Sequence, residues 1–256
     1  MRIACAQRTQ VWDDIDASFK KADAFLLENA RSVAMVVFSE QFATGWRPGG
    51  SRISTEGVRD RWIALAAKHK VCVVGSYQKA VAGGLPQNTM LVCGPSGEVI
   101  AEYSKMYLFT PGKEDRCFSP GTDPVMFEYG GVKFGCAICF DLRFPELFRE
   151  YLKMGCECVL VQAAWPAARV ADWELLLRAR ALENRGFVIG AACMGYDPMS
   201  GTDYCGRSMV CDYEGRVVSD GGVFEGECSG EVDVDGVREM RREWGMEYFI
   251  CHIRFM

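Results

Sequence analysis

The sequence predicts an α/β protein in which two sheets pack face to face between two layers of helices, a four-layer α-β-β-α sandwich. Three observations support this prediction. Short apolar stretches alternate with amphipathic stretches of helical period, the same order of elements occurs twice, and each half ends in a hairpin motif. No low-complexity linker separates the halves, so we expect residues 1–256 to form one domain.

The first half is predicted to have the order β-α-β-α-β followed by a hairpin. RIACAQ, VAMVVF and VCVVGS are short apolar runs of strand length. Residues 14–31 and 58–70, which lie between these runs, have the spacing of amphipathic helices. The stretch LVCGPSGEVI then places two apolar runs around turn residues that include a glycine, which is typical of a hairpin.

The second half repeats this order. Its predicted strands are KFGCAI, CVLVQA and FVIGAA, its predicted helices are residues 145–154 and 171–184, and its hairpin is MVCDYEGRVV. Because the helices are apolar along one side only, each half covers one face of its sheet with helices, and the two remaining sheet faces bury each other. A single doubly wound sheet is the alternative.

The composition excludes several classes of partner. The chain carries a net charge of −5, a pI near 5.3 and no basic block, so no nucleic-acid partner is expected. No apolar run reaches the roughly 18 residues that a membrane span needs, and MRIACAQRTQ lacks the apolar region of a signal peptide. We therefore expect a cytoplasmic protein without a membrane partner.

The thirteen cysteines are an odd number, and most lie in apolar, strand-like runs. This favours small buried side chains in a reducing compartment over a disulfide scaffold. No CxxC pair or nearby histidine completes a metal ligand set, so no metal is expected. The only histidines, His69 and His252, do not follow predicted central strands, which makes a Cys–His catalytic pair improbable.

Three ionisable residues follow predicted strands, where sites of α/β proteins usually lie. Cys139 stands between a strand and a helix, a position that favours the thiolate, although one more buried cysteine is the alternative. Glu40 follows VAMVVFS, and partial desolvation there raises the pKa of a carboxyl toward that of a general base. Lys105 lies among aromatic and apolar residues and has the charge to stabilise an oxyanion. A loop carboxylate and a surface lysine are the alternatives.

The segments FSEQFATGW, YSKMYLFTPGKE and GCAICFDLRFPE together resemble the nitrilase superfamily of carbon-nitrogen hydrolases, over nearly the whole chain. The resemblance implies an α-β-β-α sandwich and a Glu-Lys-Cys triad. Cys139 would be the nucleophile, Glu40 the general base, and Lys105 the oxyanion stabiliser together with the N–H of Phe140. Glu114 falls where many members have a second glutamate, with a solvated charge as the alternative. No cofactor is implied.

The stretch AAWPAARVADWELLLRARALENRGFV resembles that of omega-amidases, which hydrolyse the terminal amide of short 2-oxo acids such as 2-oxoglutaramate. Asp172 stands where these relatives typically have histidine. Nitrile hydrolysis and N-carbamoyl amino acid hydrolysis are the alternatives within the superfamily, and a catalytically silent binding protein is the alternative outside it.

Several residues are candidates for the substrate pocket. Trp165 ends a predicted strand and is expected either to wall the pocket or to pack in the core. Arg143 or Arg47 has the charge to pair with a substrate carboxylate, and a salt bridge from Arg143 to Asp141 or Glu146 is the competing interpretation. Bulky aromatic residues in the loops after Glu40 and Cys139 predict a small pocket; they are Phe42, Trp46, Phe140 and Phe144.

The last thirteen residues are rich in large apolar side chains. Those of Trp244, Tyr248, Phe249, Ile250, Ile253 and Phe255 lie in this tail. An apolar tail is not expected to remain in water, so we predict a homo-oligomer, most simply a homodimer, with a tail folded over its own sheet as the alternative.

Overall fold

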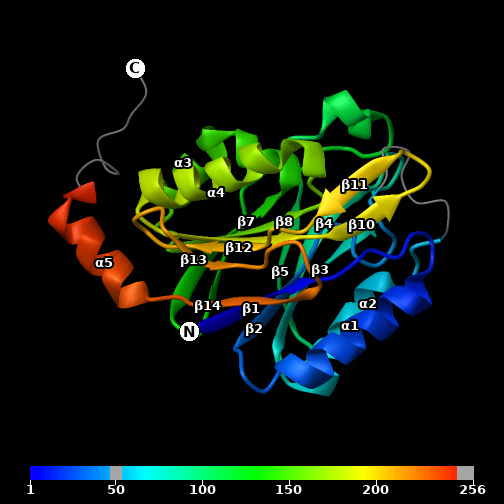
Figure 1. Ribbon diagram of the computed structural model, residues 1–256, viewed down its shortest axis with the longest axis horizontal. Helices are drawn as coiled ribbons and strands as arrows, with labels where there is room; N and C mark the ends of the chain where they lie inside the picture. Colours follow the sequence, from blue (N-terminus) through cyan, green and yellow to red (C-terminus); the bar gives the residue numbers. More distant parts are fainter. Residues whose placement is uncertain (47–53, 247–256) are drawn as a thin grey trace.

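Two six-stranded sheets face each other in the computed structural model, which describes residues 1–46 and 54–246 (Figure 1). The first sheet has the order β14 (Gly226–Glu231), β1 (Arg2–Gln7), β2 (Met35–Phe38), β3 (Cys72–Lys79), β4 (Gln87–Cys93) and β5 (Val99–Ser104). The second has the order β13 (Val217–Asp220), β12 (Met209–Cys211), β9 (Phe187–Ala192), β8 (Cys158–Ala163), β7 (Val132–Ile138) and β6 (Met126–Tyr129).

Helices cover the outer face of each sheet. Figure 1 shows α1 (Ile15–Asn29) and α2 (Val58–His69) on one side of the sheet pair and α3 (Pro145–Lys153) and α4 (Val170–Asn184) on the other. These four helices are the predicted ones, with ends shifted by two residues at most. The α-β-β-α sandwich is therefore confirmed, and the single doubly wound sheet is wrong.

Both predicted hairpins form at the predicted places. Strands β1, β2 and β3 run parallel, and β4 and β5 then add antiparallel. In the second sheet β7, β8 and β9 run parallel, and β12 and β13 follow antiparallel. The turns contain Gly97 and Gly215 at φ 86° and 73°, a left-handed conformation that glycine adopts without steric cost.

Several elements were not predicted. The strands β6 and β14, the small hairpin of β10 (Met194–Asp197) and β11 (Thr202–Cys205), and helix α5 (Val234–Glu243) extend the two repeated halves. Strand β14 belongs to the second half of the chain but pairs antiparallel with β1 in the first sheet. Its sequence, GECSGE, has too few apolar residues to signal a strand, and its backbone pairing with β1 defines it.

The main apolar core lies between the two sheets. A buried polar side chain lies at the end of this core where β2 and β8 end. Gln162 in β8 is fully buried, and its Nε2 donates to the carbonyl oxygens of Phe38 and Gly75 at 2.8 and 3.1 Å. These two carbonyls belong to the first sheet. Gln162 thus links the sheets where β2 and β8 end, directly below the strand ends that carry the candidate site.

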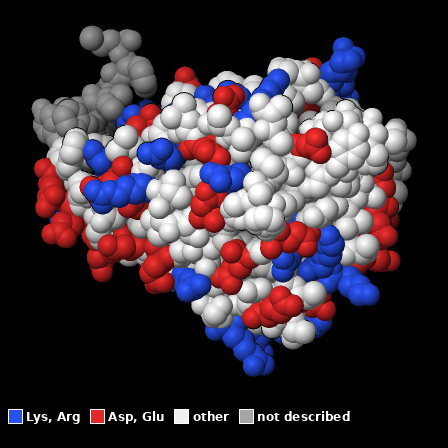
Figure 2. Space-filling model, in the orientation of Figure 1, with Lys and Arg blue, Asp and Glu red and all other residues white. Residues whose placement is uncertain are grey.

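Mixed surface charge and free cysteines characterise the described part of the chain. Figure 2 shows basic and acidic side chains interspersed over the visible face. No described helix is long and apolar enough to cross a membrane. The twelve cysteines of the described ranges are all free, and nine of them are buried.

Candidate active site

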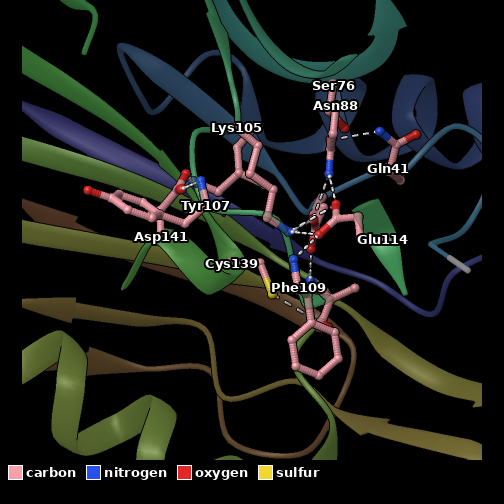
Figure 3. A network of polar contacts seen from close by, with 12 residues as sticks. Gln41, Ser76, Asn88, Lys105, Tyr107, Phe109, Glu114, Cys139 and Asp141 are labelled. Carbon is pink, nitrogen blue, oxygen red and sulfur yellow. Dashed lines mark hydrogen bonds and ion pairs between the residues drawn. The ribbon is translucent and has the colours of Figure 1, made fainter. Parts of the chain in front are cut away.

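Three strand ends bring Glu40, Lys105 and Cys139 together. Figure 3 shows Lys105 and Cys139 of this cluster with the neighbouring Glu114 and Asn88. Glu40 follows β2 and Lys105 follows β5, both in the first sheet, whereas Cys139 follows β7 in the second. The side chains of Glu40 and Lys105 have no exposed surface. The strand ends of both sheets therefore supply the cluster that the sequence singled out.

The Lys105 ammonium is the centre of this cluster. Its Nζ lies 2.9 Å from Oε1 of Glu40 and 2.8 and 3.1 Å from the two carboxylate oxygens of Glu114. Burial lowers the pKa of Lys105, but the charges of Glu40 and Glu114 outweigh burial and raise it well above its ordinary value. Lys105 is thus a permanent buried cation and not a surface lysine.

The Glu40 carboxylate is fixed at both oxygens. Oε1 accepts from Nδ2 of Asn88 at 2.8 Å as well as from Lys105, and Oε2 accepts from the backbone N–H of Ala164 at 2.9 Å. Burial raises the pKa of Glu40, the Lys105 charge lowers it, and the net direction is upward. This is the direction that we expected for a base at the end of an apolar strand.

Glu114 is buried, so the solvated-charge alternative is wrong. It lies in a 3₁₀ turn, η2 (Glu114–Arg116), and accepts from the backbone N–H of Phe109 at 2.6 Å and from Asn88 at 3.1 Å. Burial raises its pKa, yet the Lys105 ammonium and these hydrogen bonds lower it overall. Glu114 is therefore the more firmly ionised of the two carboxylates that flank Lys105.

Cys139 begins a 3₁₀ turn, η3 (Cys139–Arg143), and has a left-handed backbone with φ 48°. Such a conformation costs a non-glycine residue about 1–3 kcal/mol and is typical of residues held in place for function. Burial and the neighbouring Glu40 charge raise the pKa of its thiol well above the usual value. The expected preference for the thiolate is therefore wrong, since burial and Glu40 outweigh the Lys105 charge.

Asp141 fixes the turn that carries Cys139. Its fully buried carboxylate accepts from the N–H of Ile138 and the hydroxyl of Tyr103, at 2.8 and 2.7 Å, and from the N–H of Tyr107 at 2.8 Å. Burial raises the pKa of Asp141 to about 6, against the opposing effect of Lys105 and these hydrogen bonds. The carboxylate thereby joins the Cys139 turn to the segment after Lys105.

Arg143 pairs with neither of the carboxylates that were expected. Its Nη2 lies 2.5 Å from Oδ2 of Asp172, at the start of α4, and its guanidinium lies 5.2 Å from the ring centroid of Trp165. The Asp141 carboxylate instead accepts hydrogen bonds from Ile138, Tyr103 and Tyr107. The salt-bridge interpretation of Arg143 is thus correct in kind but wrong in partner. Arg47, the other candidate, lies outside the described residues.

Cys139 opens onto a pocket with a small cavity of about 30 Å³. Phe140, Trp165 and Arg143 are all at its wall, together with Trp46, Phe109, Ala164, Pro166 and Arg169. Trp165 is also packed at 5.4 Å on Trp173, so both interpretations of this residue hold. Of the expected aromatic residues, Phe42 packs instead in the core below α2, and Phe144 stacks on Tyr107 at 3.8 Å.

The sequence analysis missed two buried polar residues, Asn88 and Asp141. Asn88 bridges Glu40 and Glu114 and also accepts from Gln41 at 2.7 Å. An asparagine in the apolar strand QNTMLVC was a usable signal, because asparagine is depleted in strands. Asp141 is two residues after Cys139 and was considered only as a partner of Arg143.

Neither histidine contributes to this site in the described structure. His69 is at the end of α2, where its Nε2 lies 2.6 Å from Asp23, and His252 is outside the described residues. Within residues 1–46 and 54–246 there is no group of three or more His, Cys, Asp or Glu side chains with the geometry of a metal site.

Known proteins are similar in sequence to most of this chain. Residues 2–242 match the family model for carbon-nitrogen hydrolases. The chain is 32% identical to the 2-oxoglutaramate amidase of Bacillus subtilis, with 93% of each chain covered. It is 28% identical to an omega-amidase of Xenopus tropicalis, with 88% of this chain and 86% of that protein covered.

A solved structure extends the similarity to the fold. An amidase from Nesterenkonia sp. AN1 superposes with a TM-score of 0.86 at 25% identity, covering 97% of this chain and 99% of that chain. It was solved as a glutamate-to-glutamine variant whose active-site cysteine carries the product of Michael addition of acrylamide.

Proposed function

This chain belongs to the carbon-nitrogen hydrolase family, and we propose that it hydrolyses a short, carboxylate-bearing linear amide to an acid and ammonia through a thioester on Cys139. The protein is an amidase of the nitrilase superfamily, as its relatives are.

The observation that carries the proposed roles is the fixed position of the Glu40 carboxylate between a buried ammonium and a thiol. Lys105 and Asn88 hold one oxygen, Ala164 holds the other, and the Cys139 thiol is close enough for the Glu40 charge to raise its pKa. A base with a raised pKa beside a thiol with a raised pKa is suited to proton transfer at the moment of attack.

The first half of the reaction forms the thioester. Glu40 accepts the thiol proton as Sγ of Cys139 attacks the amide carbon, and the carbonyl oxygen becomes negative. The Lys105 ammonium and the backbone N–H of Phe140 stabilise this oxygen. The C–N bond then breaks, and Glu40 returns the proton to the leaving nitrogen, which departs as ammonia.

The second half releases the acid. Water loses a proton to Glu40 and attacks the thioester carbon, and Cys139 leaves as the thiol after recovering that proton. Glu114 stays ionised throughout, because its lowered pKa keeps a negative charge beside Lys105. It thus holds the ammonium in place while Glu40 changes its protonation state. Neither metal nor organic cofactor takes part in these steps.

A panel of substrates tests this proposal. We expect ammonia release from 2-oxoglutaramate and succinamic acid, with at least about a tenfold higher kcat/KM than for a long-chain neutral amide. Nitriles and N-carbamoyl amino acids, which the same three residues are chemically able to attack, are the second arm. If nitriles or N-carbamoyl amino acids are turned over faster than any amide, the substrate assignment is wrong. If no substrate releases ammonia, the proposed catalytic roles are wrong.

We also propose a cytoplasmic homodimer. The free, mostly buried cysteines fit a reducing compartment and support the cytoplasmic location.

Exposed apolar side chains support the homodimer. Trp244 is exposed and lies under the guanidinium of Arg185 at 3.9 Å, and Leu175 and Leu182 of α4 are exposed as well. The other apolar residues of the tail lie outside the described part of the chain. Exposed apolar side chains of this kind favour burial against a second copy.

A further inference from the structure

We propose that Arg169 is the residue that recognises the substrate carboxylate, which deepens and rests on the proposed amidase function. Two arginines, Arg143 and Arg169, line the pocket above Cys139. They differ in how their charges are used. This difference decides which of them is available to an anionic substrate.

The charge of Arg143 is already balanced. Its guanidinium pairs with Asp172 at 2.5 Å and stacks on Trp165. A substrate carboxylate placed there would meet the Asp172 carboxylate as well as the guanidinium, and the two negative charges would repel each other. Arg143 therefore lines the pocket, but its positive charge is already neutralised by Asp172.

The guanidinium of Arg169 makes no ion pair with any carboxylate in residues 1–46 and 54–246. It lies instead over the ring of Phe109 at 5.6 Å, a second wall of the same pocket. Its backbone is fixed, because its carbonyl oxygen accepts from Nε1 of Trp165 at 2.7 Å and its N–H donates to the carbonyl oxygen of Pro166 at 2.9 Å. The Arg169 guanidinium is thus available to an anionic substrate and is carried by a segment whose backbone is held by hydrogen bonds.

The position of Arg169 also implies a limit on substrate length. A wider groove of about 580 Å³ adjoins the pocket and shares Trp46, Phe109, Pro166 and Arg169 with it. Asp203 lines this groove but not the pocket that holds Cys139. A carboxylate held by Arg169 at the junction is stabilised, whereas one carried further along the groove approaches Asp203 and is repelled. The acyl chain is therefore expected to have one preferred length.

A series of amide acids tests this inference in the full-length protein. Ammonia release is measured for malonamic, succinamic, glutaramic and adipamic acids and for butyramide as the neutral reference. We expect one chain length to be preferred by the wild type. The Arg169→Gln variant is expected to lower the ratio of kcat/KM for that acid to kcat/KM for butyramide by about tenfold, mainly through KM, and Arg169→Lys by less.

Two further variants make the test decisive. Arg216→Gln removes an exposed arginine that lines neither the pocket nor the groove, and it should retain the wild-type ratio. Arg143→Gln should lower the ratio less than Arg169→Gln does. The reverse order would assign the carboxylate to Arg143 and overturn this inference alone. Equal turnover of acids and butyramide by the wild type would overturn both the inference and the proposed substrate class, while leaving the amidase chemistry standing.

Discussion

Replacing Lys105 with methionine removes a buried cation that pairs with two buried carboxylates, those of Glu40 and Glu114. At an effective dielectric constant of about 20, contacts of 2.9 Å to Glu40 and 2.8 Å to Glu114 are each worth about 6 kcal/mol of Coulomb attraction. Most of this offsets the cost of burying the ammonium. Removing one member of a buried ion pair costs about 3–5 kcal/mol, because the charge left behind has no partner, and we expect Lys105→Met to lower the free energy of unfolding by this amount at pH 7.

The pH dependence of this loss gives a second readout. Without the ammonium, the already raised pKa of Glu40 rises further in the folded state, and the pKa of Glu114 rises above its ordinary value of 4.5. The folded variant then binds more protons than its unfolded chain, so its stability increases as the pH falls from neutral toward that value. In the wild type the lowered pKa of Glu114 contributes stability that is kept over this range and is lost only below pH 4.5, as the pH falls toward the lowered pKa. The difference between the two proteins is therefore largest at neutral pH.

Urea unfolding of the two proteins between pH 5 and pH 8 measures both effects. Lys68→Met is the matched control, because Lys68 pairs with Asp23 at 2.7 Å but is 59% exposed. An exposed ion pair is worth about 0–1 kcal/mol, so the control should stay within that range. A loss below about 1 kcal/mol in Lys105→Met, or a loss that grows as the pH falls, would refute the account of Lys105 as a compensating buried cation.

Other expected outcomes concern the reaction and the assembly. Cys139→Ala and Cys139→Ser should abolish ammonia release and keep the circular dichroism spectrum; turnover within tenfold of wild type would exclude the thioester. Glu40→Gln should slow hydrolysis by a factor of about 10² to 10⁴. The same variant should speed alkylation of Cys139 by iodoacetamide at pH 8, because the Glu40 charge that raises the thiol pKa is gone. Slower alkylation would contradict this effect of Glu40 on the thiol. Light scattering should give a particle of twice 28.5 kDa, and the monomer mass would exclude the dimer.

The sequence predicted those parts of the site that depend on local pattern. Glu40 and Cys139 each follow an apolar run, and sites of α/β proteins usually lie beyond the ends of strands, so each was predictable as a site residue from its own strand position, although the two strands belong to different sheets. Strand β14 was not predictable, because its few apolar residues give no periodic signal and its pairing with β1 joins residues more than 200 positions apart.

Polar partners in the site were hard to predict for the same physical reason. The partners of Asn88 include Glu40, which is 48 positions away, and Arg143 pairs with Asp172, 29 positions away, and not with the nearer Asp141 or Glu146. The unfavourable pKa shift of Cys139 also depends on the closed packing around it, which outweighs the favourable effect of a strand-to-helix turn. Local sequence carries no information on such burial.

The link made by Gln162 has a consequence for how the reacting groups are spaced. Glu40, Lys105 and Asn88 belong to one sheet, whereas Cys139 and Ala164 belong to the other. The distance between nucleophile and base is therefore set by the thickness of the apolar layer between the sheets. Gln162 joins the two sheets at the edge of this layer through its hydrogen bonds to Phe38 and Gly75. A bulkier side chain deep in that layer would act on the reaction as a spacer, separating the two halves of the catalytic machinery without touching any of its members.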